Sequence, residues 1–318
     1  MSPPVVFPSQ RSSHFLSLLT TVVGSAGRVE NFLAAVPLLY KKSVTDSQKT
    51  THEISGPGGP ITYDRLGQGP PLLLINGYGA SRVDWDPGFL ENLAGSSTVY
   101  CPDNRGIGGS AFGDGNLSID LMAGDMLGLL DSLGLDEADV AGWSMGGFIS
   151  QQLASMAPER VSGLVLMSTD PGGEIRVPPE REDWRKLTDH SGGPHDQAKR
   201  LLELLFPPAM AAGVYEEFGD LVAAAQEKLD PEVISAQEAA MIAWAKGPSK
   251  ARLEAITAPV LAVAGSEDLV IPPGNAEVIA RHLPDALLTE MTWDDDTEVA
   301  VALVGDPKEV RDVSLAHR

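Results

Sequence analysis

The stretch Gly142-Trp143-Ser144-Met145-Gly146-Gly147 contains the pattern Gly-x-Ser-x-Gly, and its flanking residues determine what the pattern means. Residues 139–143 have the character of a short buried strand, and residues 145–155 that of a helix. Glycines two residues before and two after Ser144 let neighbouring backbone pass closely, so that its hydroxyl is exposed in a strained turn. A glycine-rich helix start with a serine N-cap is the structural alternative. The order strand, turn and helix favours a nucleophilic serine.

Short β-rich runs alternate with helical runs from residue 50 onward. Leu72-Leu73-Leu74-Ile75 is a continuous apolar run, typical of a strand that is covered on both faces of a parallel sheet. We predict strands over residues 51–55, 61–66, 71–76, 97–101, 139–143, 161–167, 259–264 and 286–291, and helices over residues 86–93, 119–133, 145–155, 274–282 and 307–317. This order predicts an α/β fold with a mostly parallel sheet and helices on both faces.

The stretch between residues 174 and 256 interrupts the alternation. It is rich in Ala, Leu and Glu, and it contains no strand pattern. We therefore predict a helical cap over residues 174–256, inserted into a core formed by residues 49–173 and 257–318. Residues 1–48 are predicted to form an N-terminal tail with a peripheral helix. The apolar run at residues 15–23 is an alternative export signal, but its basic region is poor and favours a cytoplasmic protein.

The overall composition excludes several classes of protein. The 318 residues include 23 Lys and Arg against 44 Asp and Glu, a formal net charge of −21, which argues against broad contacts with nucleic acid or anionic membranes. The single cysteine, Cys101, excludes an intrachain disulfide and is expected to be a buried, inert thiol. No apolar run reaches the roughly 18 residues that span a bilayer.

Three further segments accompany the serine motif. Asn76-Gly77-Tyr78-Gly79 and Asp103-Asn104-Arg105-Gly106 each follow a predicted strand, and Gly265-Ser266-Glu267-Asp268 follows the strand over residues 259–264. Together with the serine motif, they resemble the α/β-hydrolase fold family over about residues 50–318. That family usually has His-Gly where this sequence has Asn76-Gly77.

The resemblance implies a role for each matching residue. Ser144 is the expected nucleophile. The backbone N–H groups of Tyr78 and Met145 are the expected oxyanion hole, and the change from His to Asn76 leaves this donor in place because it is a backbone group. Asp268 matches the triad acid.

A second candidate for the acid is Asp170. The Pro-Gly-Gly that follows it is typical of an ordinary turn, and this favours a structural role. His190 and His195 lie among polar, turn-forming residues of the predicted cap, so we expect them to face solvent rather than to act in catalysis.

The catalytic histidine of the family follows the last strand, and residues 292–298 contain none. An ungapped count from Asp268 points to Asp296 for this place, whereas a count back from the next helix points near Ala300. An Asp is a weaker base than a His by about 2.6 pKa units. Asp296 and Asp268 at close range would share a proton and raise one pKa toward neutrality. Such a pair would serve a cyclisation, elimination or isomerisation better than it would activate Ser144. The alternatives are a solvated acidic loop or a shifted reading frame near Met291.

These observations leave two functions open. The first is a serine hydrolase that acts on an ester-like or other acyl compound, a small and largely apolar molecule bound beneath the cap. The second is a non-hydrolytic member of the fold, either a lyase or cyclase or a ligand-binding protein, which the missing histidine favours. Neither needs a metal or nucleotide cofactor, since the sequence has no phosphate-binding loop and its histidines are scattered.

Overall fold

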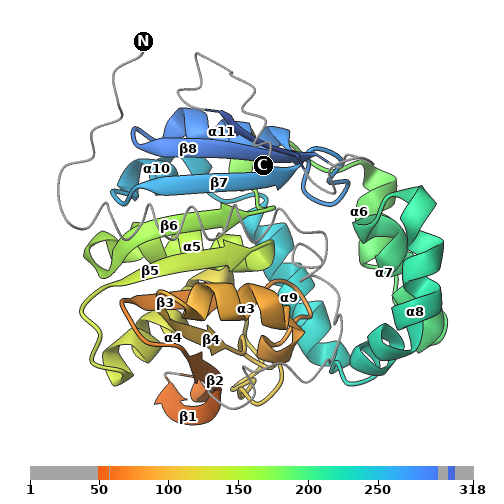
Figure 1. The fold of residues 1–318 in the computed structure, drawn as a ribbon, viewed down its shortest axis with the longest axis horizontal. Helices are drawn as coiled ribbons and strands as arrows, with labels where there is room; N and C mark the ends of the chain where they lie inside the picture. Colours follow the sequence, from red (N-terminus) through yellow and green to blue (C-terminus); the bar gives the residue numbers. More distant parts are fainter. Residues whose placement is uncertain (1–48, 57, 293–299, 305–318) are drawn as a thin grey trace.

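The computed structural model describes residues 49–56, 58–292 and 300–304. The predicted tail and peripheral helix, and the predicted helix over residues 307–317, lie outside them. The strands are β1 (Thr50–Gly56), β2 (Gly59–Leu66), β3 (Pro71–Ile75), β4 (Thr98–Pro102), β5 (Ala138–Trp143), β6 (Val161–Met167), β7 (Val260–Gly265), β8 (Ala286–Thr292) and β9 (Ala300–Val304). They form one sheet in the order β1-β2-β4-β3-β5-β6-β7-β8-β9 (Figure 1).

The six strands from β4 through β8 in this order run parallel to one another, and β1, β2 and β9 join the sheet antiparallel at its edges. This confirms the predicted α/β fold with a mostly parallel sheet. The central strands are almost wholly buried, as their continuous apolar runs indicate.

Alternate side chains of the central strands enter two separate hydrophobic cores. The helices of the sheet are α3 (Pro87–Ala94), α4 (Ile119–Ser132), α5 (Met145–Met156) and α11 (Gly274–His282). Leu72 and Leu74 pack in the core that includes α3, whereas Leu73 and Ile75 pack in the core that includes α4, α5 and α11. A strand that projects side chains to both faces thus needs helices on both faces, as the sequence predicts.

The strand β9 was not among the predicted elements. It pairs antiparallel with β8, with Thr292 opposite Ala300. The apolar run from residue 299 to residue 304 is the signal that could have revealed it. One of the two counts placed the missing base near Ala300, which is the first residue of β9. The other count pointed to Asp296, which lies outside the described residues.

The chain between β6 and β7 forms five helices: α6 (Arg181–Leu187), α7 (Pro194–Leu205), α8 (Pro208–Gln226), α9 (Pro231–Trp244) and α10 (Ser249–Ala255). The helices α7 and α8 share a small hydrophobic core of their own that includes Leu202, Phe206 and Val222. Figure 1 shows α6, α7 and α8 standing beside the sheet rather than on either face. The helix α10 packs against α5, so it adjoins the sheet. The division into core and cap at residues 174 and 256 stays a prediction.

The only cysteine, Cys101, is fully buried in β4, as expected, and burial raises the pKa of its thiol. Among the residues that the structure describes, no three His, Cys, Asp or Glu side chains are grouped so as to hold a metal ion. None of the helices described here is long and apolar enough to cross a membrane.

Replacing Leu74 by Ala tests the two-sided core. Leu74 has no exposed surface, so Leu74→Ala is expected to lower the free energy of unfolding by about 2–5 kcal/mol through lost burial and a residual cavity. Leu121→Ala is the matched control, because Leu121 is 43% exposed and should change the value by no more than about 0.5 kcal/mol. Equilibrium urea unfolding measures both, and equal losses would contradict the assignment of Leu74 to the core.

Candidate active site

Ser144 lies at the sharp turn between β5 and α5. Its φ of 54° and ψ of −120° place it in a region of backbone space that residues other than glycine rarely occupy. A Cβ on Gly142 would clash with the carbonyl oxygen of Gly146, and a Cβ on Gly146 would clash with that of Ile75. The two glycines of the motif therefore let α5 approach β5 and β3 closely, which is the steric reason that the sequence suggested.

Three hydrogen bonds hold the strained turn. The backbone N–H of Ser144 donates to the carbonyl oxygen of Met167 at 2.9 Å. The carbonyl oxygen of Ser144 accepts from the N–H of Gly147 and from the hydroxyl of Thr169, each at 2.9 Å. Ser144 remains partly exposed, and its side chain faces the large cavity described below. The backbone is thus fixed while the hydroxyl stays accessible.

The loop after β3 carries the first expected oxyanion-hole donor, at Tyr78. Asn76 is fully buried here. Its side-chain oxygen accepts from the N–H of Gly77 at 2.9 Å, and its side-chain nitrogen donates to the carbonyl oxygen of Ser81 at 2.8 Å. Asn104 in turn donates to the carbonyl oxygen of Asn76 at 2.8 Å. The side-chain amide of Asn76, at the position of the family's usual histidine, therefore links the start of the loop to Ser81. Nothing in the sequence indicated this role.

The second expected donor, Met145, is the first residue of α5. The first N–H groups of a helix have no partner within the helix, and the helix dipole favours negative charge beside them. Both features suit a group that stabilises a developing oxyanion.

The helix α9 supports the Tyr78 loop from the cap side. The N–H of Gly79 donates to the side-chain oxygen of Gln237 at 2.9 Å, and the hydroxyl of Tyr78 donates to Glu238 Oε1 at 2.6 Å. Gln237 is fully buried, whereas Gly79 is half-buried and lines the cavity. The loop is thus held both by the core and by the cap.

The turn after β4, which contains Asp103, supports the loop after β3 that contains Tyr78. Asp103 accepts from the backbone N–H of Arg82 at 2.7 Å and from that of Gly109 at 2.9 Å, and it forms an ion pair with the Arg82 guanidinium. Arg105 forms two hydrogen bonds with Asp125, at 2.8 and 2.6 Å. Asp103 therefore holds the loop after β3 in place, whereas Arg105 joins the turn to α4, and neither residue lines the cavity.

Asp268 follows β7 and faces the same cavity as Ser144. Its Oδ1 accepts from the N–H of Val270 at 3.0 Å and from that of Ile271 at 2.8 Å, and its side chain also bonds to that of Ser168. Ser168 itself has a positive φ of 44°. Burial is the largest influence on the Asp268 carboxyl and raises its pKa, against the lowering effect of these three donors. Its neighbour Glu267 is exposed.

Asp170, the second acid candidate, is buried after β6. Its Oδ1 accepts from the N–H of Gly172 at 2.7 Å and from the indole of Trp244 at 3.2 Å, and Arg176 lies 3.6 Å from its other oxygen. Burial raises the pKa of this carboxyl too. The bond to Gly172 is the turn that the sequence indicated.

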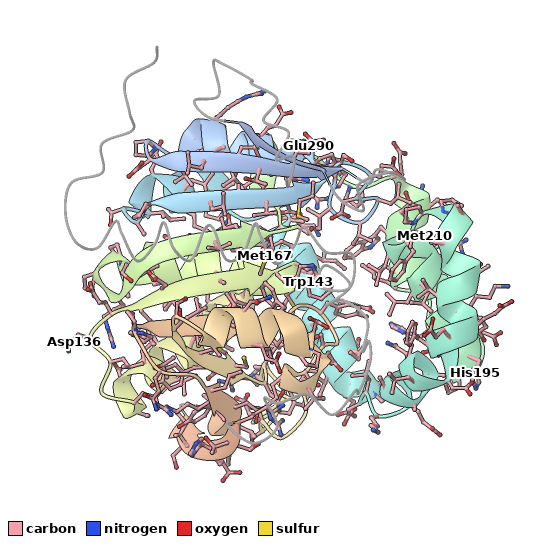
Figure 2. All side chains as sticks on the ribbon, viewed as in Figure 1. Asp136, Trp143, Met167, His195, Met210 and Glu290 are labelled. Carbon is pink, nitrogen blue, oxygen red and sulfur yellow. The ribbon has the colours of Figure 1, made fainter. Side chains whose placement is uncertain are left out.

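The cavity lies between the sheet and the helices α6, α7, α8 and α9, and has a volume of about 1290 Å³. Ser144, Asp268 and Tyr78 contribute to its wall from the sheet side, and most of its surface is apolar. Figure 2 shows Trp143 and Met167, at the ends of β5 and β6, on the side of the sheet that faces the cap. The site therefore combines an accessible serine, a carboxylate and an apolar chamber.

The histidines of the described residues lie in very different places. His190 is exposed, as expected, and it also lines the cavity, with Nε2 2.6 Å from Glu238 Oε1. His195 is exposed on the outer side of the cap (Figure 2). His282 bonds to a carbonyl of its own helix, and His52 stacks on Tyr63 in the β1–β2 hairpin. Nothing local in the sequence marks His190, because its partner Glu238 is 48 residues away.

Comparison with known proteins identifies the family of this chain. Residues 70–292 match the family described as alpha/beta hydrolase fold. The carbamate hydrolase named RutD from Azorhizobium caulinodans is 30% identical over 75% of this chain and 88% of that protein. A 2-hydroxymuconate semialdehyde hydrolase from a Pseudomonas species is 28% identical over 76% of this chain and 86% of that protein. The structure of a thermophilic esterase from Thermogutta terrifontis aligns with a TM-score of 0.62 and 26% identity, over 76% of this chain and 90% of that one.

The chain therefore belongs to the alpha/beta hydrolase fold family, and it is an enzyme of the hydrolase class. These relatives favour the hydrolase over the non-hydrolytic alternative. The family match ends at residue 292, immediately before the segment in which the base was expected.

The raised pKa of Asp268 predicts a dependence of stability on pH. A carboxyl that binds its proton more tightly in the folded state stabilises the fold below its unfolded pKa, about 3.9, and this stabilisation is lost as the pH rises through the higher folded-state pKa. Relative to Asp268→Asn, the wild type should therefore lose free energy of unfolding as the pH rises from about 4. Urea unfolding across this range measures the difference.

The matched control for this experiment is Glu267→Gln, which removes an exposed negative charge next to the buried one. A difference between wild type and Asp268→Asn that stays constant with pH would show that the carboxyl is not held in this environment.

Proposed function

We propose that this enzyme hydrolyses ester-like or other acyl compounds through a covalent intermediate on Ser144. The observation that carries the proposal is the place of Ser144, in a strained strand-to-helix turn with its side chain facing a cavity of about 1290 Å³. Asp268 faces the same cavity from the end of the strand β7. Such a turn is a typical site for a nucleophile in this fold.

In the first step, Ser144 Oγ attacks the acyl carbon and gives up its proton to a base. The carbonyl oxygen gains negative charge and accepts hydrogen bonds from the N–H groups of Tyr78 and Met145. The leaving group departs with a proton, and the acyl group stays on Ser144. Water then attacks the acyl carbon, which releases the acid and restores the hydroxyl.

The base in this scheme belongs to the segment that follows β8. The register places Gly265 opposite Met291, and the N–H of Ser266 donates to the carbonyl oxygen of Met291 at 2.8 Å, so this segment starts beside the loop of Asp268. Asp296 is the proposed proton acceptor, paired with Asp268. It lies outside the described residues, and the proposal for it rests on its position in the sequence.

The proposed substrate is a small and largely apolar molecule, because the cavity wall is mostly apolar. The relatives are named for a carbamate, a semialdehyde and an ester, which favours an acyl or related carbonyl group as the reacting part. A cytoplasmic location, with export through residues 15–23 as the alternative, stays a prediction because those residues lie outside the described part.

Labelling with an alkyl fluorophosphonate tests the nucleophile. The wild type is expected to gain one covalent adduct on Ser144, and Ser144→Ala is expected to lose both the adduct and the hydrolysis of short-chain nitrophenyl esters, by at least about a thousandfold. Ser155→Ala, on the same helix, is the matched control and should keep both. Mass spectrometry locates the adduct, and an unlabelled Ser144 in active enzyme would overturn the proposal.

Asn76→Ala tests the oxyanion loop. The change leaves the N–H of Gly77 and the carbonyl oxygen of Ser81 without their buried partner, which should cost about 1–3 kcal/mol of unfolding free energy. A loosened Tyr78 donor should also lower kcat by about ten- to hundredfold with little change in KM. Asn116→Ala, in an exposed turn, is the control. An unchanged kcat in folded Asn76→Ala would show that the hydrogen bonds of Asn76 do not position the Tyr78 donor for the reaction.

A further inference from the structure

A polar cluster formed by Tyr78, His190 and Glu238, here called the Glu238 cluster, lies in the wall of the cavity, which is mostly apolar but also includes other charged residues such as Arg176 and Lys186. Its members come from the loop after β3, from the connection between α6 and α7, and from α9. The hydroxyl of Tyr78 donates to Glu238 Oε1 at 2.6 Å, and His190 Nε2 lies 2.6 Å from the same oxygen. All three residues line the cavity that also holds Ser144.

The arrangement does not serve only to fasten the cap. The bond between Gly79 and the buried Gln237 already joins α9 to the same loop, through the residue after Tyr78 and the residue before Glu238. The contacts at Glu238 are more exposed than this bond, because the Glu238 side chain keeps 20% of its surface exposed and that of His190 keeps 49%. A second connection that a ligand in the cavity can reach therefore suits a different task.

The chemistry of the cluster defines what it can bind. Burial and the neighbouring Glu238 both raise the pKa of Tyr78, so its phenol keeps its proton and remains a donor to the carboxylate. The Glu238 side chain keeps 20% of its surface exposed. A carboxylate accepts hydrogen bonds and attracts positive charge, so the matching ligand group is a donor, either a hydroxyl or an ammonium.

The size of the cavity indicates how far this hydroxyl or ammonium group lies from the acyl carbon of the substrate. At about 1290 Å³, the cavity exceeds the 300–1000 Å³ or so that is common for small-molecule sites. A short ester at Ser144 leaves much of this space empty, whereas a longer molecule reaches the cap wall with its distal end.

We propose that the Glu238 cluster is a recognition subsite for a hydrogen-bond donor, a hydroxyl or ammonium group, at the end of the substrate remote from the acyl carbon. This inference rests on the proposed function, since it takes the acyl carbon to lie at Ser144. It names the substrate class as acyl compounds with a polar donor at the far end of an apolar chain.

The test compares nitrophenyl esters of plain, ω-hydroxy and ω-amino straight-chain acids of four, six and eight carbons. For at least one chain length, the wild type should prefer a donor-bearing ester over the plain ester by about tenfold or more in kcat/KM, as a hydrogen bond to a charged group predicts. Glu238→Leu should reduce this ratio to about one. Glu238→Gln keeps an acceptor but loses the charge, so it should abolish a preference for ammonium and only weaken one for hydroxyl.

A variant outside the cluster serves as the control. Glu232→Gln, which changes an exposed carboxyl on the same helix, should keep the wild-type ratio. Equal ratios in wild type and Glu238→Leu at every chain length would overturn the subsite.

A binding measurement separates this proposal from the proposed function. The corresponding acid amides are titrated by calorimetry into Ser144→Ala and into the double variant Ser144→Ala with Glu238→Leu. Tighter binding of a donor-bearing amide to the first protein alone supports the subsite even if no ester is hydrolysed. Equal affinities, or no binding of the donor-bearing amides, count against it even if Ser144 is shown to be the nucleophile.

Discussion

The close approach of α5 to the ends of β5 and β3 is the constraint on which the site depends. A helix that starts directly after a buried strand must turn sharply within one residue, and Ser144 takes up that strain with a positive φ. Gly142 and Gly146 make this possible because any side chain at either position would clash with backbone. The turn holds the serine in position while leaving its hydroxyl in the cavity, which a relaxed helix start would not do.

The other parts of the site are arranged around this turn by polar groups rather than by the apolar core. Asn76 closes the neighbouring loop with both ends of its amide, and Gln237 holds the same loop from the cap. Asp268 is held by two backbone N–H groups and by Ser168. The bonds of Asn76 and Asp268 lie in the loops after parallel strands, where this class of sheet places its ligand sites, and the bond of Gln237 joins one of these loops to α9. The sheet thus supplies the frame, and the bonds set the geometry.

Much of this could be predicted from the sequence because its signals are local. The apolar run 72–75 marks a doubly covered strand, and the motif around Ser144 needs only five consecutive residues. Asp268 follows shortly after the strand β7, so its place could be predicted from the sequence. By contrast, the short apolar run of β9 directly follows an acidic segment, so the sequence does not mark it clearly as a strand. Its pairing with β8 is seen only in the folded sheet.

The sequence by itself determined the parallel sheet, the place of the proposed nucleophile and the lack of a histidine in residues 292–298, since each depends on residue types over short distances. Only the tertiary structure decided that Asn76 closes the oxyanion loop and that His190 meets Glu238 in the cavity wall. The physical reason is that these contacts join segments brought together by the packing of the cap and by loop closure. No periodicity along the chain encodes which of its many polar side chains will be neighbours across a cavity.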